Sequence, residues 1–281
     1  MNVIQKIEPL RTRLKSQKLA GETLALVPTM GALHEGHLAL VRRARDVADR
    51  VVVSIFVNPL QFGPQEDFAR YPRDLAHDVQ LLADLGVDTV FAPSVDDMYP
   101  LGNSWTRVEV TTMSAVLCGR TRPTHFAGVT TVVSKLFNLV QPDFAVFGEK
   151  DWQQLAIIRR MVADLNFPVT IIGVPTVREP DGLAKSSRNQ YLSPEDRLRA
   201  PALYRGLQQA QSLYQTGERQ VEALIQAARG IMEEAGIDPE YLEIVDPVTL
   251  EPMDTPLDRP ARMATAARVG GARLIDNIGL G

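Results

Sequence analysis

Two of the four histidines in the chain lie three residues apart in a short segment that also contains two glycines. This segment, residues 28–37 (PTMGALHEGH), includes His34 and His37. Both imidazoles can donate hydrogen bonds to one anionic group, such as a phosphate whose charge grows during transfer. Gly31 and Gly36 allow the backbone to approach a ligand closely. The segment therefore predicts a site for the phosphates of a nucleotide.

Other interpretations of this segment fit less well. Neither a cysteine cluster nor an HExxH pattern accompanies the histidines, so a zinc site is not indicated. Gly31 and Gly36 have the spacing of a Walker A loop, but His37 stands where lysine belongs and no Ser or Thr follows it. The absence of a GxGxxG pattern argues against a dinucleotide-dependent dehydrogenase. The remaining alternative is that both histidines are incidental surface residues.

Two further segments have side chains suited to a polar substrate and a phosphate. Residues 54–62 (SIFVNPLQF) end an apolar run with Asn58 and Gln61. Their neutral amides can both donate and accept hydrogen bonds, although Asn-Pro is also a common turn. Residues 147–154 (FGEKDWQQ) place Lys150 at an expected helix start, where a cation is unfavourable unless an anion is near. Asp151 beside it could be no more than a helix cap.

A fourth polar segment, residues 181–189 (DGLAKSSRN), combines hydroxyl groups with Arg188. Hydroxyls beside an arginine are typical of a phosphate clamp. A solvated linker has the same composition, so the segment alone supports both interpretations.

Alternating apolar and amphipathic segments are expected to position these motifs. The expected strands are residues 23–27, 51–57, 87–91, 144–147 and 169–174, and the expected helices are residues 38–48, 73–85, 129–140 and 151–165. This order predicts an α/β fold, a Rossmann-like parallel sheet with helices on both faces. Ligands of such sheets bind at the carboxyl ends of the strands.

The pattern changes after residue 174. A polar, turn-rich stretch is followed by expected helices at residues 195–216 and 220–235 and by expected strands at residues 241–245, 261–269 and 272–275. We therefore predict two domains, a Rossmann-like domain over residues 1–175 and a smaller C-terminal α+β domain over residues 176–281.

Composition restricts the class of protein. The chain has 30 basic and 34 acidic side chains, and this balance argues against nucleic acid as the main partner. Its one cysteine, Cys118, excludes an intrachain disulfide and fits a reducing compartment. A buried small side chain is the favoured interpretation of Cys118 and a nucleophile the alternative. The sequence contains neither a signal-peptide pattern nor an apolar run of membrane-spanning length, so we expect no membrane association and a cytoplasmic location.

Taken together, the motifs are specific enough to indicate a protein family. The His34-Glu35-Gly36-His37 element resembles the nucleotidylyl-transferase superfamily, which includes class I aminoacyl-tRNA synthetases. The four segments above, together with YPRD (residues 71–74), RPTHFAGV (residues 122–129) and ARLIDN (residues 272–277), resemble the pantothenate synthetase (pantoate–β-alanine ligase) family in order along nearly the whole chain.

The resemblance implies a two-step reaction. ATP and (R)-pantoate give pantoyl adenylate and pyrophosphate, and the amine of β-alanine then attacks to give pantothenate and AMP. It also implies Mg²⁺ with the triphosphate and a homodimer. Two rival functions are an adenylyltransferase of the same fold acting on another vitamin or cofactor precursor, and a non-catalytic module that binds a nucleotide or tRNA.

The resemblance also implies roles for individual residues. The ATP-binding residues are Met30, Gly31, Ala32, Leu33, His34, Glu35, Gly36, His37, Gly148, Glu149, Lys150, Asp151, Val177, Lys185, Ser186, Ser187 and Arg188. The implied catalytic residues are His37, His34, Lys150 and Arg188, and pantoate and β-alanine are held by Gln61, Gln154 and Asn58. We expect no metal ion held by protein ligands, and we expect the C-terminal domain to act as a lid.

Two positions depart from common members of the family. Lys185 stands where Met or Leu is frequent, and it either adds a cation near the phosphates or points to solvent. Some members carry Glu at the position of Cys118, which puts a salt bridge from this position to Arg122 in doubt.

Overall fold

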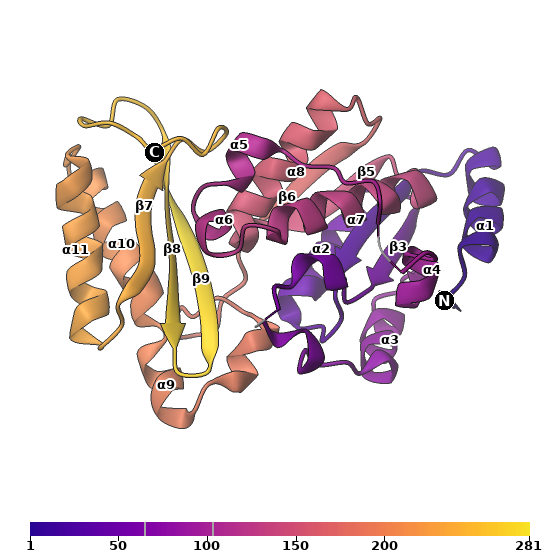
Figure 1. The fold of residues 1–281 in the computed structure, drawn as a ribbon, viewed down its shortest axis with the longest axis horizontal. Helices are drawn as coiled ribbons and strands as arrows, with labels where there is room; N and C mark the ends of the chain where they lie inside the picture. Colours follow the sequence, from indigo (N-terminus) through magenta and orange to yellow (C-terminus); the bar gives the residue numbers. More distant parts are fainter. Residues whose placement is uncertain (65, 103) are drawn as a thin grey trace. The chain divides into compact units, whose positions relative to one another are not determined.

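The computed structural model describes residues 1–64, 66–102 and 104–281 (Figure 1). Contacts between Cα atoms divide the chain into two compact units. Unit 1 consists of Met1–Ser114, Arg122–Glu149 and Ile157–Pro175, and unit 2 consists of Ala115–Thr121, Lys150–Ala156 and Thr176–Gly281. Unit 2 is therefore not one continuous stretch of sequence, because two short earlier segments belong to it.

Unit 1 is built on a six-stranded parallel sheet. Its strand order is β1-β4-β3-β2-β5-β6. The strands are β1 (Asn2–Ile4), β2 (Leu24–Thr29), β3 (Arg50–Ile55), β4 (Thr89–Phe91), β5 (Phe144–Gly148) and β6 (Thr170–Val174). The order reverses between β2 and β5, because the chain continues from β2 to one side of the sheet while β5 lies on the other. Such a switch point is where parallel sheets bind ligands.

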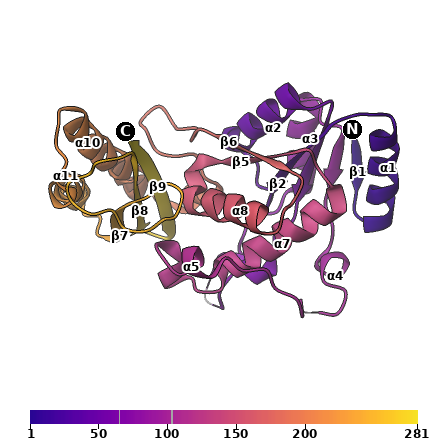
Figure 2. The same ribbon diagram turned by 90° about the horizontal axis from the view of Figure 1, so that it is seen from above.

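Helices cover this sheet. The helices of unit 1 are α1 (Ile7–Leu19), α2 (Glu35–Val47), α3 (Leu75–Asp84), α4 (Val95–Met98), α5 (Thr111–Ser114), α7 (His125–Val140) and most of α8 (Trp152–Asp164). Alternate strand residues, among them Val27 and Val53, pack against Leu40 and Val41 of α2 and Leu82 of α3. Figure 2 shows α7 on the opposite face of the sheet. Both faces of β3 are buried, which explains why its sequence is mostly apolar.

The expected fold class of this part is confirmed, with corrections to the elements. The strand β1 and the helix α1 were not expected, because a three-residue strand and a helix with scattered charges give weak periodic signals. The histidine segment therefore follows the second strand of the chain, not the first. Helix α2 begins at Glu35, earlier than expected, because the side chain of His34 caps it.

Unit 2 contains an antiparallel sheet of β7 (Pro239–Val245), β8 (Ala261–Val269) and β9 (Ala272–Leu280), in that order. Helices α10 (Ala202–Gln215) and α11 (Val221–Glu234) pack on it through a shared apolar core. Unit 2 also includes α6 (Cys118–Thr121) and α9 (Pro194–Arg199). The expected smaller C-terminal α+β fold is confirmed.

Two expected elements of unit 2 differ from the structure. The helix expected at residues 195–216 is split into α9 and α10. Pro201 lies between the two helices and has no N–H to continue the first one. Strand β9 extends to Leu280, beyond the expected end at residue 275. Among the described residues, no helix combines the length and the apolar composition needed to cross a membrane.

Candidate active site

The loop between β2 and α2 has a backbone that only some residues adopt readily. Gly31 has φ 80° and Ala32 has φ 50°, both in the left-handed region. A Cβ atom on Gly31 would lie 2.9 Å from Oδ2 of Asp78. Glycine is therefore required at position 31, both for its conformation and for the space beside Asp78.

Asp78 of α3 holds this loop in place, and it lies outside the motifs predicted from the sequence. Its carboxylate accepts hydrogen bonds from the backbone N–H of Ala32 (2.9 Å) and of Leu33 (2.7 Å). Only 1% of Asp78 is exposed. Burial raises its pKa, although the two N–H donors act in the opposite direction. The available signal was an acidic residue four positions before Leu82, on the apolar face of an amphipathic helix.

Backbone N–H groups at the start of α2 fix the tautomers of both histidines. Nδ1 of His34 accepts from the N–H of Gly36 (3.1 Å), and Nδ1 of His37 accepts from the N–H of His34 (3.3 Å). A backbone N–H can only donate, so neither Nδ1 carries the proton and each neutral ring carries it on Nε2. The ring centroids are 4.1 Å apart. The pair therefore presents two N–H donors at the amino end of a helix, where the dipole also favours an anion.

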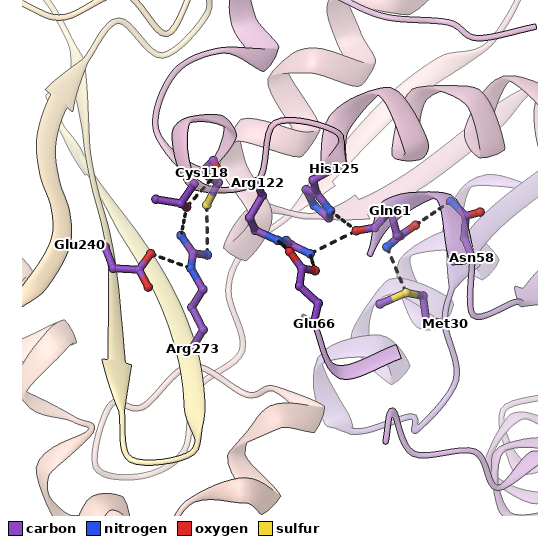
Figure 3. Close-up of polar contacts among 10 residues, drawn as sticks. Met30, Asn58, Gln61, Glu66, Cys118, Arg122, His125, Glu240 and Arg273 are labelled. Carbon is purple, nitrogen blue, oxygen red and sulfur yellow. Dashed lines mark hydrogen bonds and ion pairs between the residues drawn. The ribbon is translucent and has the colours of Figure 1, made fainter. Parts of the chain in front are cut away.

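The two amides predicted to bind substrate lie together beyond β3. Asn58 precedes the short 3₁₀ helix Pro59–Gln61, and both amide side chains are buried. Nδ2 of Asn58 donates to Oε1 of Gln61 (3.1 Å), and Nε2 of Gln61 lies 3.0 Å from Sδ of Met30. Figure 3 shows Gln61 between these two neighbours. The structure thus brings together three of the predicted residues of unit 1.

The backbone carbonyl of Gln61 is held by Arg122, which forms an ion pair with Glu66, and by His125 (Figure 3). Arg122 contacts both carboxylate oxygens of Glu66, at 2.7 and 2.5 Å, and also donates to the carbonyl oxygen of Gln61 (3.3 Å). Nδ1 of His125 lies 2.8 Å from the same carbonyl and must be its donor, because a carbonyl only accepts. Burial opposes the ionisation of Glu66, but the hydrogen bonds and charge of Arg122 outweigh it and lower the pKa of Glu66.

The carboxyl end of β5 supplies two further predicted residues of unit 1, Gly148 and Glu149. Gly148 ends the strand and Glu149 begins a 3₁₀ turn. A Cβ on Gly148 would lie 4.0 Å from Cδ2 of Leu40 in α2. The end of β5 therefore lies beside the helix that carries His37, on the other side of the switch point of the sheet.

The other predicted residues belong to unit 2. Lys150 and Asp151 continue the 3₁₀ turn, and their charged groups are 4.0 Å apart. The carbonyl of Lys150 accepts a hydrogen bond from Nδ2 of Asn277 in β9 (2.9 Å). Gln154 lies in the first turn of α8 and is half-buried.

A loop of unit 2 contains Val177 and the predicted phosphate clamp. The carbonyl of Val177 accepts from the N–H of Lys185, and Nζ of Lys185 pairs with Glu179 at 2.9 Å. Oγ of Ser186 accepts from the N–H of Arg188 (3.3 Å) and caps the 3₁₀ helix Ser187–Tyr191. Lys185 is thus held by a carboxylate of its own loop.

Arg178 joins this loop to the sheet of unit 2. Its guanidinium contacts both carboxylate oxygens of Asp276 in β9, at 2.6 and 2.8 Å. It also donates to the carbonyl of Gly182 and lies over the ring of Tyr204. Asp276 and Asn277 are adjacent in β9, so one position of this strand holds both the Lys150 turn and the loop.

The structure favours a structural role for Cys118. Its buried Sγ lies 3.1 Å from the hydroxyl of Tyr241 and 3.5 Å from Nη1 of Arg273, which also binds Glu240 (Figure 3). Burial raises the pKa of Tyr241. Neither a protonated tyrosine nor a guanidinium can act as a general base for the thiol. The salt bridge that was in doubt, between position 118 and Arg122, is replaced by another ion pair, because Arg122 binds Glu66.

Among residues 1–64, 66–102 and 104–281, no group of three or more His, Cys, Asp or Glu side chains could hold a metal ion.

The family model for pantoate–β-alanine ligase matches residues 2–279. The chain belongs to the pantoate–β-alanine ligase family. A pantothenate synthetase of Thermotoga petrophila is 54% identical over 282 residues, covering 100% of both chains. The solved pantothenate synthetase of Thermus thermophilus is 51% identical, covers 99% of each chain and superimposes with a TM-score of 0.94.

A third relative of this ligase family was solved with ligands. It is the pantoate–β-alanine ligase of Francisella tularensis, in complex with beta-gamma ATP and β-alanine. It is 35% identical, with coverage of 99% of this chain and 97% of that one and a TM-score of 0.83. The predicted family and ligase activity are confirmed, and the rival adenylyltransferase and non-catalytic module are set aside.

Proposed function

We propose that the chain condenses (R)-pantoate with β-alanine in two steps. A pantoate carboxylate oxygen attacks the α-phosphorus of ATP, and pyrophosphate leaves. The amine nitrogen of β-alanine then attacks the acyl carbon, the C–O bond to AMP breaks, and the nitrogen loses a proton. The observation that carries this proposal is the pair of Nε2–H donors at the start of α2, which suits phosphate charge that grows as a bond breaks.

The histidine loop is proposed to hold the triphosphate. His34 and His37 donate to its oxygens, and the dipole of α2 adds to their effect. Gly31 and Gly36 let the backbone approach, and the carboxylate of Asp78 fixes the intervening N–H groups so that the loop is already arranged before ATP binds. Met30, Ala32, Leu33, Glu35, Gly148 and Glu149 are proposed to line the nucleotide site in unit 1.

In unit 2 we propose that Lys150, Ser186, Ser187 and Arg188 contact phosphates, and that Asp151 and Val177 contact the rest of the nucleotide. Lys185 is already paired with Glu179. We therefore assign Lys185 to maintaining the loop rather than to direct phosphate contact. Val177 supports the same loop through its carbonyl.

Asn58, Gln61 and Gln154 are proposed to bind pantoate, with Gln61 also near β-alanine. Neutral amides suit a substrate that carries hydroxyl groups and a carboxylate. An enzyme nucleophile is unnecessary, because adenylation makes the acyl carbon reactive and the amine of β-alanine attacks it. Catalysis is then mainly positioning and stabilisation of phosphate charge.

ATP enters this scheme as a substrate, and we propose Mg²⁺ as its counter-ion. Mg²⁺ usually keeps several waters and binds through substrate phosphates. We further propose a homodimer in the cytoplasm, on the family resemblance and on the single cysteine of the chain. The lid role of residues 176–281 stays a prediction.

Isotope exchange tests the two-step reaction. Labelled pyrophosphate should exchange into ATP when pantoate is present and β-alanine is absent, because the first step is reversible and complete without the amine. The enzyme must first be freed of carried-over β-alanine, and omission of pantoate is the control. A preparation that makes pantothenate but shows no exchange without β-alanine would contradict the adenylate intermediate.

A further inference from the structure

A chain of hydrogen bonds inside unit 1 leads to Gln61. Tyr99, directly after α4, donates from its hydroxyl to Oδ1 of Asn58 (2.9 Å). Asn58 in turn donates from Nδ2 to Oε1 of Gln61 (3.1 Å). Tyr99, Asn58 and Gln61 are 3%, 1% and 8% exposed, so water does not compete with these bonds.

Two backbone groups determine the direction of this chain. The carbonyl of Gly128 in α7 accepts from Nδ2 of Asn58 (3.1 Å), and the N–H of Leu60 donates to its Oδ1 (3.3 Å). A carbonyl only accepts and an N–H only donates, so the amide of Asn58 has one satisfied orientation. In that orientation Asn58 directs an N–H at Gln61, so the side-chain oxygen of Gln61 must be the acceptor.

The amide nitrogen of Gln61 consequently faces away from Asn58, toward Sδ of Met30 (3.0 Å). A thioether sulfur is a weak acceptor. A substrate oxygen that replaces this contact therefore gains a better hydrogen bond than the one it displaces. Burial raises the pKa of Tyr99, so its hydroxyl remains a donor at neutral pH and the polarity of the chain is preserved.

We propose that Tyr99 is a positioning residue for the acid substrate. Together with Asn58 it holds Gln61 with Nε2–H directed at an acceptor oxygen of pantoate. The inference rests on the proposed function, in which Gln61 binds pantoate. Tyr99 acts through two other side chains and does not itself touch the substrate.

A double-mutant cycle tests this relay. Tyr99→Phe should raise the KM for pantoate about threefold to tenfold, the effect of losing one buried hydrogen bond, while kcat and the KM for ATP stay within about twofold. Gln61→Ala should raise the same KM at least as much. In the Gln61→Ala background, Tyr99→Phe should add less than about twofold, because its target is gone. Tyr214→Phe in α10, which also removes one hydroxyl, is the matched control and should change none of these constants.

The outcomes separate the inference from the proposed function. An unchanged KM for pantoate in Gln61→Ala overturns the assignment of Gln61 itself. A raised KM in Gln61→Ala with an unchanged KM in Tyr99→Phe, or with effects that multiply in the double variant, overturns the role of Tyr99 alone. A purely structural role would lower Tm and kcat together, in both backgrounds.

The polarity can be tested without changing Tyr99. Gln61→Glu keeps the shape of the side chain and replaces the amide nitrogen with an oxygen, so the donor becomes an acceptor. We expect its KM for pantoate to equal or exceed that of Gln61→Ala. A Gln61→Glu enzyme that binds pantoate better than Gln61→Ala overturns the proposed donor role.

Discussion

At the amino end of α2, two backbone N–H groups decide where the imidazole protons lie. Because Nδ1 of His34 and of His37 accepts a backbone hydrogen bond, the neutral form of each ring carries its proton on Nε2. A neutral donor is well suited to a phosphate whose negative charge is largest in the transition state. It strengthens its interaction as the charge grows, without holding the substrate too tightly beforehand.

The contribution of His37 can be measured directly. His37→Ala should lower the rate of pantoyl-adenylate formation about 100- to 1000-fold, the usual effect of removing one such donor. Single-turnover formation of the adenylate is the measurement. His77→Ala, which removes an exposed histidine from α3, is the control and should leave the rate unchanged. A His37→Ala rate within threefold of the unmodified enzyme would show that the donor is dispensable.

Glu66 and Arg122 predict a pH dependence of stability. The pKa of Glu66 is lower in the folded chain than its ordinary value of 4.5, so the unfolded chain binds more protons in the window just below 4.5. The stabilisation is complete above pH 4.5 and is lost as the pH falls through the folded pKa.

Glu66→Gln removes this pH-dependent stabilisation. The variant should lose roughly 1–2 kcal/mol of unfolding free energy at pH 7, less than a fully buried pair because both side chains keep some exposure. The difference from the unmodified chain should shrink at pH 3. Denaturant unfolding at the two pH values measures it, and a difference that is equal at both would argue that the ion pair is not its source.

At the scale of elements, the fit of α7 against the Pro59–Gln61 turn depends on one missing side chain. A Cβ on Gly128 would lie 2.3 Å from the carbonyl oxygen of Leu60 and 2.7 Å from the N of Gln61. Real contacts of a Cβ are never so short, and the atoms in the way are backbone. The helix and the turn would have to separate, and Gln61 would move with the turn.

Gly128→Ala should therefore destabilise the chain by about 1–3 kcal/mol and raise the KM for pantoate. Gly230→Ala in α11 is the matched control, since nothing lies within 4 Å of its Cβ position. Replacing a helical glycine in open space should stabilise by about 0.4–1 kcal/mol. Thermal unfolding and steady-state kinetics of both variants provide the comparison, and equal effects at the two positions would exclude the close contact as the cause.

The sequence predicted those features that depend on near neighbours. The strands and helices of the α/β sheet followed from local periodicity, and His34 and His37 were found because they lie only three positions apart in the sequence. The residues that hold the site were missed. Asp78 reaches a loop 45 residues earlier, and Arg178 meets Asp276 across 98 residues. Such partners become neighbours only through the fold, so a local pattern can mark Asp78 as an acidic residue on an apolar helix face but cannot identify the loop that it binds.

Gly128 shows the same limit for packing. It lay inside a motif that carried the family resemblance, but its role depends on the backbone of a turn near residue 60. The tautomers of the histidines were also beyond the sequence, because they depend on the cap geometry at the start of α2.

At the scale of the molecule, the loop over residues 181–189 is the segment whose behaviour should depend most on nucleotide. Gly182 has φ 94°, and polar side chains make up much of the loop. If Ser186 and Arg188 bind phosphates, an ATP analogue should protect the loop from proteolysis by about tenfold or more, as bound ligand opposes local opening. The same analogue with His37→Ala enzyme should protect less. Cleavage that is unchanged at saturating nucleotide would contradict the proposed contacts.

The adjacent pair Asp276 and Asn277 has a consequence for how the enzyme is made. Strand β9 follows every other element of unit 2 in the chain, yet it supplies the partners of Arg178 and of the Lys150 carbonyl. A ribosome therefore completes the sequences of the Lys150 turn and of the Arg178 loop long before either can be held in place. During synthesis the nascent chain contains the proposed ATP ligands of unit 2 before it contains the residues that hold them, and these contacts can form only after β9 has been made.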